Sequence, residues 1–139
     1  MKQILPGIVR VYVCECADVP EDADLMGVAN GLRPVIMDAE EQPIYGLGEL
    51  SVETDRDGAL GYATATLTYR SSVDMGRTRG LCYCVRAVDD TDYLIGSAER
   101  GVRVASVRRF GTPGGDASCF EHTVTYTGLK ALQECLIVG

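Results

Sequence analysis

Apolar side chains recur at every second residue along most of this chain, and this period constrains the fold more than any other feature. The clearest case is residues 62–69 (YATATLTY), where Ala63, Ala65, Leu67 and Tyr69 share one face and threonines occupy the other. Successive side chains on a β-strand point to opposite faces, so the pattern predicts a half-buried strand. Alternating threonines suit a sheet surface that faces solvent or a lumen.

The same period predicts further strands at 8–16, 32–37, 47–54, 81–88, 93–96, 102–110, 119–126 and 132–138. Residues 8–16 have so few polar positions that we expect a strand buried on both faces. Pro34 places the 32–37 strand towards a sheet edge. An aspartate-rich turn joins 81–88 to 93–96 and predicts a hairpin whose turn its own charge keeps in solvent.

Between the strands the pattern breaks down. Residues 20–31 read as an acidic loop with at most one helical turn, residues 71–80 have room for a short helix, and residues 111–116 form a glycine-rich loop. No linker or repeat divides the 139 residues, and a chain of this length buries one ordinary core. We therefore expect a single all-β domain spanning 1–139, an antiparallel sandwich or small barrel of seven to eight strands with at most one short helix.

Net charge excludes several partners. The chain carries 13 basic and 20 acidic side chains, a formal charge of −7, whereas binding to nucleic acid or to an anionic membrane surface relies on a basic face. The N-terminus lacks the apolar run of a secretory signal, and no stretch is long enough to span a membrane. We expect a cytoplasmic protein that binds neither nucleic acid nor membrane directly.

The charge is unevenly placed along the sequence. Residues 1–57 hold four basic and twelve acidic side chains, a balance of −8, whereas residues 58–139 hold nine and eight, a balance of +1. Within 70–109 there are eight arginines and five acids. A solvated mixed surface accounts for this distribution. The alternative is a head-to-tail interface in which the acidic patch of one subunit meets the arginines of the next.

The six cysteines include two Cys-x-Cys pairs, Cys14 with Cys16 and Cys82 with Cys84. Each pair would share one face of a strand, so four thiolates would suffice for a structural zinc ion. Zinc ligands are usually spaced further apart and sit in turns, whereas these pairs lie in apolar, β-branched runs. Our main interpretation is that these cysteines are small buried side chains on central strands. A zinc site and disulfide bonds are the alternatives.

No catalytic or cofactor motif stands out. His122, the only histidine, shares its predicted strand face with apolar residues, and no recognisable nucleophile motif accompanies it, so we read it as a core or rim residue with one hydrogen bond. Asp89, Asp90 and Asp92 lack calcium-loop spacing. Gly46-x-Gly48 lacks the strand–turn–helix context of a dinucleotide site. The sequence therefore predicts a protein that is not an enzyme and has no cofactor.

The order of features from residue 60 to 128 carries a resemblance. A threonine-alternating strand leads to the hairpin that contains Tyr93-Leu94-Ile95-Gly96-Ser97, and an arginine-rich strand leads to Gly111-Thr112-Pro113-Gly114-Gly115-Asp116 and a last strand ending in Thr127-Gly128. This order resembles small structural proteins from prophages of gut Bacteroidetes, of the tail or head–tail joining type. The motifs that carry the resemblance are patterns of turns and strands, and none of them is catalytic. The six cysteines are a departure that the resemblance does not explain. The resemblance implies a β-sandwich or barrel subunit that assembles into rings.

Two functions follow as expectations. The first is a non-enzymatic structural subunit of a phage or phage-derived particle, tail-associated, that contacts itself and other particle proteins through Asp18, Glu21, Asp22, Asp24, Arg77, Arg79, Arg100, Arg103, Arg108 and Arg109. The second is a soluble β-barrel binding module for a small ligand or peptide, with a pocket lined by Tyr62, Tyr69, Tyr83, Tyr93 and Tyr126.

Overall fold

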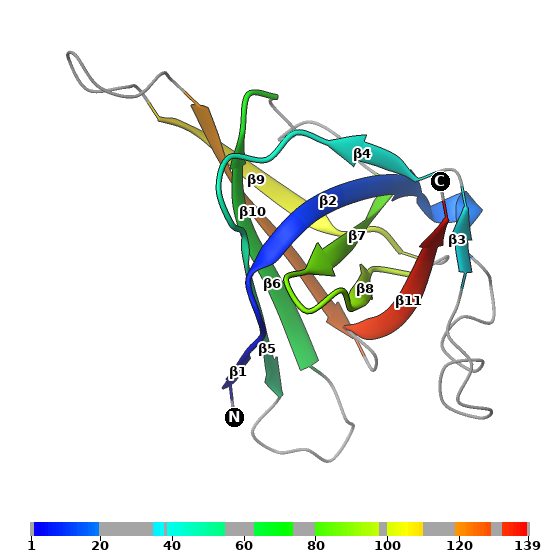
Figure 1. Cartoon of the computed structure of the whole chain (residues 1–139). Coiled ribbons are helices and arrows are strands. Elements are labelled where there is room, and N and C mark those ends of the chain that lie inside the picture. The colour runs from blue at the N-terminus through cyan, green and yellow to red at the C-terminus, as the bar shows by residue number, and fades with distance from the viewer. Residues whose placement is uncertain are drawn as a thin grey trace.

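The computed structural model describes residues 2–19, 35–37, 39–54, 63–73, 80–97, 100–109, 119–128 and 132–138, without the side chains of residues 2, 18, 37, 109, 133 and 138. These residues form two β-sheets that pack face to face, as Figure 1 shows. The expected antiparallel β-sandwich is confirmed. The predicted loops at 20–31 and 111–116, and most of the segment with room for a helix at 71–80, lie outside the described residues.

The first sheet has five strands, all antiparallel to their neighbours. In spatial order they are β1 (Lys2–Ile4), β5 (Glu49–Thr54), β6 (Ala63–Ser71), β10 (Cys119–Gly128) and β9 (Arg103–Arg109). The long β6–β10 pairing sets Thr64, Thr66 and Thr68 opposite Thr127, Thr125 and Thr123 on the face away from the other sheet. The alternation of residues 62–69 therefore correctly predicted which face of β6 is buried and which face carries the threonines.

The second sheet has six strands. Their spatial order is β3 (Val35–Met37), β11 (Gln133–Val138), β8 (Asp92–Ile95), β7 (Leu81–Ala87), β2 (Ile8–Glu15) and β4 (Glu40–Gln42). Only β3 and β11 are parallel among the described pairs. A short 3-10 turn, η1 (Cys16–Asp18), follows β2. The described strands number eleven, against the seven to eight expected. Nine of them overlap the segments that the sequence pattern marked, and the other two, β1 and β4, have only three residues each and leave no alternating pattern.

The main core lies between the sheets. Leu67 and Val124 from the first sheet are fully buried, and so are Val11 and Val85 from the second. Tyr69 and Tyr83 join the two layers, because their hydroxyl oxygens lie 3.0 Å apart in the buried interior. One hydroxyl donates to the other, so each buried group has a hydrogen-bond partner. The tyrosines therefore fill the core.

A second, smaller core lies on the other face of the six-stranded sheet. Cys14, Cys82 and Cys84 are buried there, under Val19 and Ile36 from the segments that follow β2 and form β3. Residues 8–16 were expected to be buried on both faces. This holds for residues 11–14, whose side chains alternate between the two cores, whereas Val9, Arg10 and Glu15 are exposed. The cysteines act as small apolar side chains in this layer.

We expect the stability of the fold to decrease in alkaline solution. Burial raises the pKa of Cys82, Tyr69 and Tyr83, and thiol hydrogen bonds followed by burial raise that of Cys84. Each group therefore stays protonated in the folded chain at pH values where it ionises in the unfolded chain. Its contribution is complete below the unfolded pKa and is lost as the pH rises above it.

Urea denaturation across the alkaline range measures this effect. The free energy of unfolding should fall above about pH 9, from the thiols, and more steeply above about pH 10, from the tyrosines. The double variant Tyr69→Phe/Tyr83→Phe should lose most of the tyrosine component and keep the thiol component, with a remainder from Tyr93, whose pKa burial also raises. A wild-type unfolding free energy that stays constant from neutral pH to about pH 11 would contradict this account.

Candidate functional site

Two open sheet edges of opposite charge are the candidate interface. β9 is the last strand of the five-stranded sheet, and β4 is the last strand of the six-stranded sheet. No described strand pairs with the far side of either one. An edge strand presents unpaired backbone N–H and C=O groups, so its side chains decide which partners it admits. We call these strands the β9 edge and the β4 edge.

The β9 edge is basic. Its sequence, RVASVRR, contains three arginines and no acid. Arg103 and Arg108 are exposed, and Val107 between them is 54% exposed. The backbone of Arg109 ends the strand. A row of arginines repels a second copy of the same edge and attracts an acidic one.

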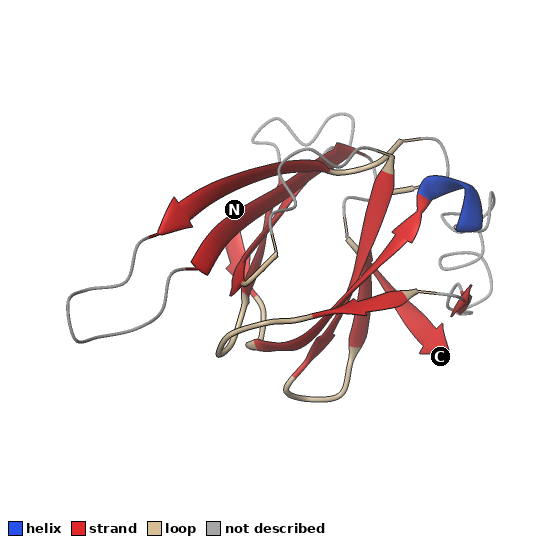
Figure 2. Cartoon of the chain, turned by 90° about the horizontal axis from the view of Figure 1, so that it is seen from above, coloured by secondary structure: helices blue, strands red, loops and turns tan. Residues whose placement is uncertain are grey.

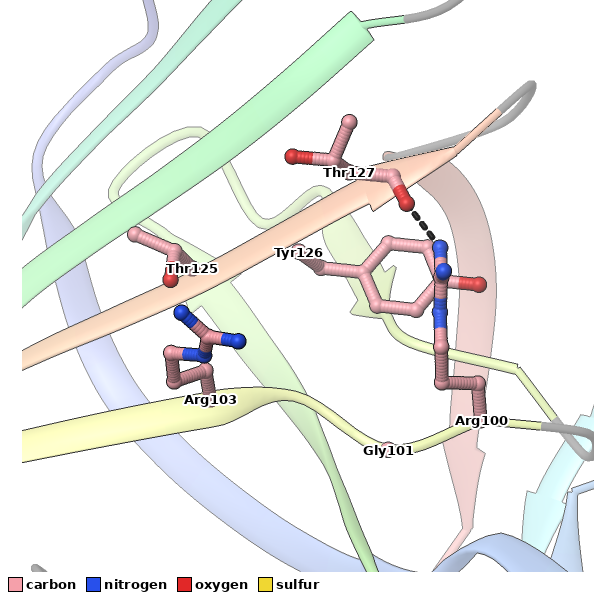
Figure 3. Close-up of a pocket in the computed structure, with 6 residues that line it drawn as sticks. All are labelled: Arg100, Gly101, Arg103, Thr125, Tyr126 and Thr127. Atoms are coloured by element: carbon pink, nitrogen blue, oxygen red, sulfur yellow. Dashed lines mark hydrogen bonds between the residues drawn. The ribbon is translucent and has the colours of Figure 1, made fainter.

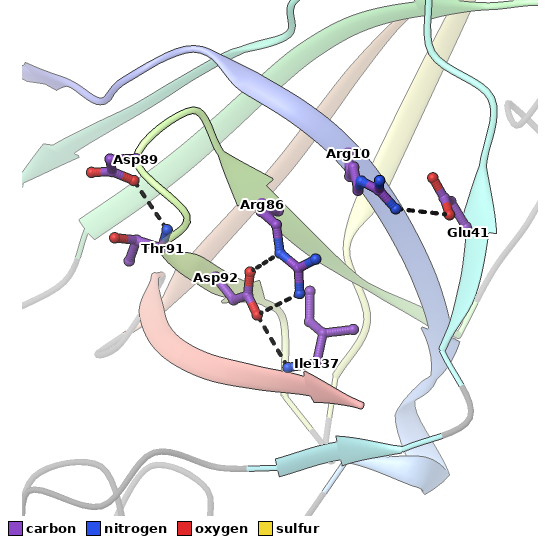
Figure 4. A network of polar contacts seen from close by, with 7 residues as sticks. All are labelled: Arg10, Glu41, Arg86, Asp89, Thr91, Asp92 and Ile137. Carbon is purple, nitrogen blue, oxygen red and sulfur yellow. Dashed lines mark hydrogen bonds and ion pairs between the residues drawn. The ribbon is translucent and has the colours of Figure 1, made fainter. Parts of the chain in front are cut away.

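The β4 edge is acidic. Glu40 and Glu41 are exposed, and the register places them opposite Val13 and Tyr12 of β2. Glu41 lies 3.7 Å from the guanidinium of Arg10, as Figure 4 shows, but both side chains are about half exposed. Such a surface pair contributes little to stability. Two glutamates against one arginine leave the edge with a net negative charge.

The structure brings together only part of the predicted interface. Arg100, Arg103, Arg108 and Arg109 all lie in β9 or in the three residues before it. Asp18 belongs to η1, with its side chain not described. The remaining predicted contacts lie outside the described residues: Glu21, Asp22, Asp24, Arg77 and Arg79. Glu40 and Glu41 were not singled out, because the charge count marked the acidic segment without showing which acids reach an edge.

Strand β9 and its neighbour β10 also extend outward from the sandwich. Figure 2 shows the ends of β9 and β10 reaching away from the rest of the sandwich, on the side of the loop between them. β10 is the longest described strand, with ten residues, and it pairs with β9 from Thr125 to Cys119. An extended hairpin offers an edge that a neighbouring molecule can reach without contacting the body of the sandwich.

His122 is buried in the core beside the β9 edge. Its Nε2 lies 2.8 Å from Ser71 Oγ and its Nδ1 lies 2.7 Å from Ser106 Oγ. The Tyr69 ring centre is 4.6 Å away. The imidazole has no exposed surface, so a dissolved substrate does not reach it. A core position was expected; the structure adds a second hydrogen bond, because β10 lies between the strands that carry the two serines.

All six cysteines lie in the described part of the chain and carry reduced thiols. Cys14, Cys82, Cys84 and Cys135 are buried, and the sulfur of the half-buried Cys16 lies 3.6 Å from that of Cys82. Although four of these are the residues considered for zinc, no three metal-ligating side chains among the described residues are arranged to hold a metal ion. Disulfides are likewise not formed.

The aspartate-rich hairpin turn differs from its predicted form at one residue. Asp89 and Asp90 are exposed as expected, but Asp92 is buried. Its two carboxylate oxygens accept hydrogen bonds from Arg86, at 2.7 and 3.2 Å, and one of them also accepts the backbone N–H of Ile137 (Figure 4). This bidentate pair ties β7, β8 and β11 together, so Asp92 supports the fold of the second sheet.

Comparison of the chain with protein-family models, with curated proteins and with solved structures gives no match. No helix within the described ranges is long and apolar enough to cross a membrane. We therefore infer function from the geometry and charge of the β9 edge and the β4 edge.

Proposed function

We propose that this protein is a non-enzymatic structural subunit of a phage or phage-derived particle, associated with the tail, and that it assembles head to tail into rings or tubes. The observation that carries the proposal is the opposite charge of two of the four outer strands that the described sheets have. The β9 edge is basic and belongs to one sheet, and the β4 edge is acidic and belongs to the other.

Opposite charges at different places favour one mode of association. Two β9 edges repel each other, and so do two β4 edges, whereas a β9 edge attracts the β4 edge of another copy. Such a contact is heterologous: each subunit uses one edge for the neighbour ahead and the other for the neighbour behind. Heterologous contacts close into rings or continue as helical tubes. The resemblance to prophage tail and head–tail joining proteins supports the same kind of assembly.

A binding module for a small ligand or peptide is the second candidate. A tyrosine-lined interior was expected to form the binding pocket. The structure does not support this, because Tyr69 and Tyr83 form a hydrogen bond with each other in a packed core. The second candidate is supported instead by a surface pocket at the start of β9, lined in part by Arg100 and Tyr126. Ligand binding there is compatible with assembly through the edges.

A charge-reversal pair tests the head-to-tail contact. Arg108→Glu lowers the formal charge of β9 from +3 to +1, and Glu40→Lys lowers that of β4 from −2 to 0, so each weakens the attraction between the two edges. Each variant alone should associate at least about tenfold more weakly than the wild type in sedimentation velocity. An equimolar mixture of the two variants should regain part of the association, because the introduced glutamate of one variant can then meet the introduced lysine of the other, while the unchanged β9 and β4 edges still attract each other.

The matched control is Arg70→Gln, which alters an exposed arginine of β6 away from both edges. It should associate like the wild type. If both reversals leave association unchanged, or if the mixture stays as weak as the single variants, the edges are not the contact. Circular dichroism and urea denaturation of each variant separate loss of association from loss of folding.

A further inference from the structure

Strand β9 stops pairing with β10 before β10 ends. The last register pair joins Arg103 to Thr125, although β10 continues to Gly128. Arg100 occupies the place of the missing strand residues: its guanidinium donates a hydrogen bond to the carbonyl oxygen of Thr127. The same guanidinium lies over the ring of Tyr126, 4.8 Å from the ring centre. Arg100 therefore replaces part of the β-ladder with a charged group.

The loop before β9 holds Arg100 in position. Ser97 and Arg100 exchange backbone hydrogen bonds of 3.0 and 3.3 Å, and the Ser97 hydroxyl accepts both the Arg100 N–H and the Tyr126 hydroxyl. Gly101 allows the loop to lie flat against β7, because a Cβ there would come within 2.7 Å of the Leu81 carbonyl oxygen. The arginine is thus largely ordered before any ligand arrives, which lowers the entropic cost of binding.

A pocket of about 280 Å³ opens at this point. Figure 3 shows Arg103 beside Thr125, and Arg100 over Tyr126. The lining consists of two guanidinium groups, hydroxyls and one aromatic ring, from residues Arg100, Gly101, Arg103, Thr125, Tyr126 and Thr127. Every charged group in this lining is positive, and both arginines are exposed.

Neither Arg100 nor Arg103 has a carboxylate within salt-bridge distance among the described residues. Their like charges repel each other, and an anion between them would remove that repulsion. Guanidinium groups bind carboxylate and phosphate oxygens through paired hydrogen bonds, and hydroxyls beside them supply further donors.

We propose that this pocket is an oxyanion-binding site, with Arg100 and Arg103 as its charged ligands and Thr125 as a hydroxyl donor. The proposal goes beyond the assembly function and does not depend on it. The volume lies at the lower limit for small-molecule sites, so the occupant is a small anion or a single acidic group. Its oxygens come either from free phosphate or from a carboxylate of a second copy.

The test is a titration of the ¹⁵N-labelled full chain with inorganic phosphate and, separately, with glutarate as a carboxylate probe, followed by NMR. Wild-type amide signals of residues 100–103 and 125–127 should shift saturably with at least one probe. Arg103→Gln should weaken that response about tenfold or more, since it removes one of two charges. Arg100→Gln should do the same, and Arg10→Gln, an exposed arginine on the other sheet, should not.

If Arg100→Gln fails to fold, Arg103→Gln is the deciding variant, because none of the hydrogen bonds that hold the described part of the loop involves Arg103. A saturable shift with phosphate alone identifies free phosphate as the source. Shifts of the same signals with protein concentration, without added anion and absent in Arg103→Gln, identify a carboxylate of a second copy. If neither probe gives a saturable shift, or if Arg103→Gln responds like the wild type, the proposed site is wrong.

Discussion

Replacing His122 by alanine is expected to lower the free energy of unfolding by about 3 kcal/mol. The imidazole is fully buried, and its removal leaves a cavity beside the ring of Tyr69. It also takes a hydrogen-bond partner from the hydroxyls of Ser71 and Ser106, of which Ser71 is almost wholly buried. The cavity and the lost hydrogen bonds act in the same direction. Urea denaturation at neutral pH measures the change.

Two further variants separate these contributions. His122→Phe keeps most of the ring volume and removes only the hydrogen bonds, so it should lose less stability than His122→Ala. Thr123→Ala alters the next residue of β10, which lies on the outer face, and should cost less than about 1 kcal/mol. If His122→Ala costs no more than Thr123→Ala, the buried histidine does not support the core as described.

Arg86→Met is expected to be as damaging, with a loss of about 3 kcal/mol. Asp92 is 7% exposed and would lose the guanidinium that now binds both its oxygens. An uncompensated buried carboxylate costs more than the pair contributes when intact. Because Asp92 also accepts the Ile137 N–H, the effect should extend to β11.

A double-mutant cycle checks the reason for this loss. Arg86→Met combined with Asp92→Leu removes both charges, so the double variant should be more stable than Arg86→Met alone. The Ile137 N–H then lacks its acceptor, so recovery to the wild-type value is not expected. Additive losses for the two single changes would show that the pair is not coupled, and would contradict the account.

Alternation in the sequence predicts most of this fold, because one buried face per strand leaves a direct trace in residue order. Residues 62–69 and 81–88 therefore appear as strands β6 and β7 close to their predicted limits. The strands β1 and β4 leave no such trace, since three residues hold at most two on one face. Their existence depends on neighbours β5 and β2, which only the three-dimensional structure supplies.

The candidate site is less predictable for a related reason. The arginine-rich strand is visible in the sequence, and Arg103 and Arg108 lie on an edge as an interface requires. Which strand becomes an edge depends on sheet order, and neighbours in the sheets are often distant in sequence. The buried pair of Arg86 and Asp92 was missed because an aspartate in a polar turn looks like any solvated charge.

Head-to-tail association is the central claim, and light scattering of the purified wild-type protein tests it most directly. At ionic strength well below 0.1 M, the molar mass should rise with protein concentration above that of a single 14.9 kDa chain. At about 1 M salt it should fall back, because the screening length drops from about 10 Å at 0.1 M to about 3 Å. A molar mass that stays at one chain at low salt and high protein concentration would contradict the account.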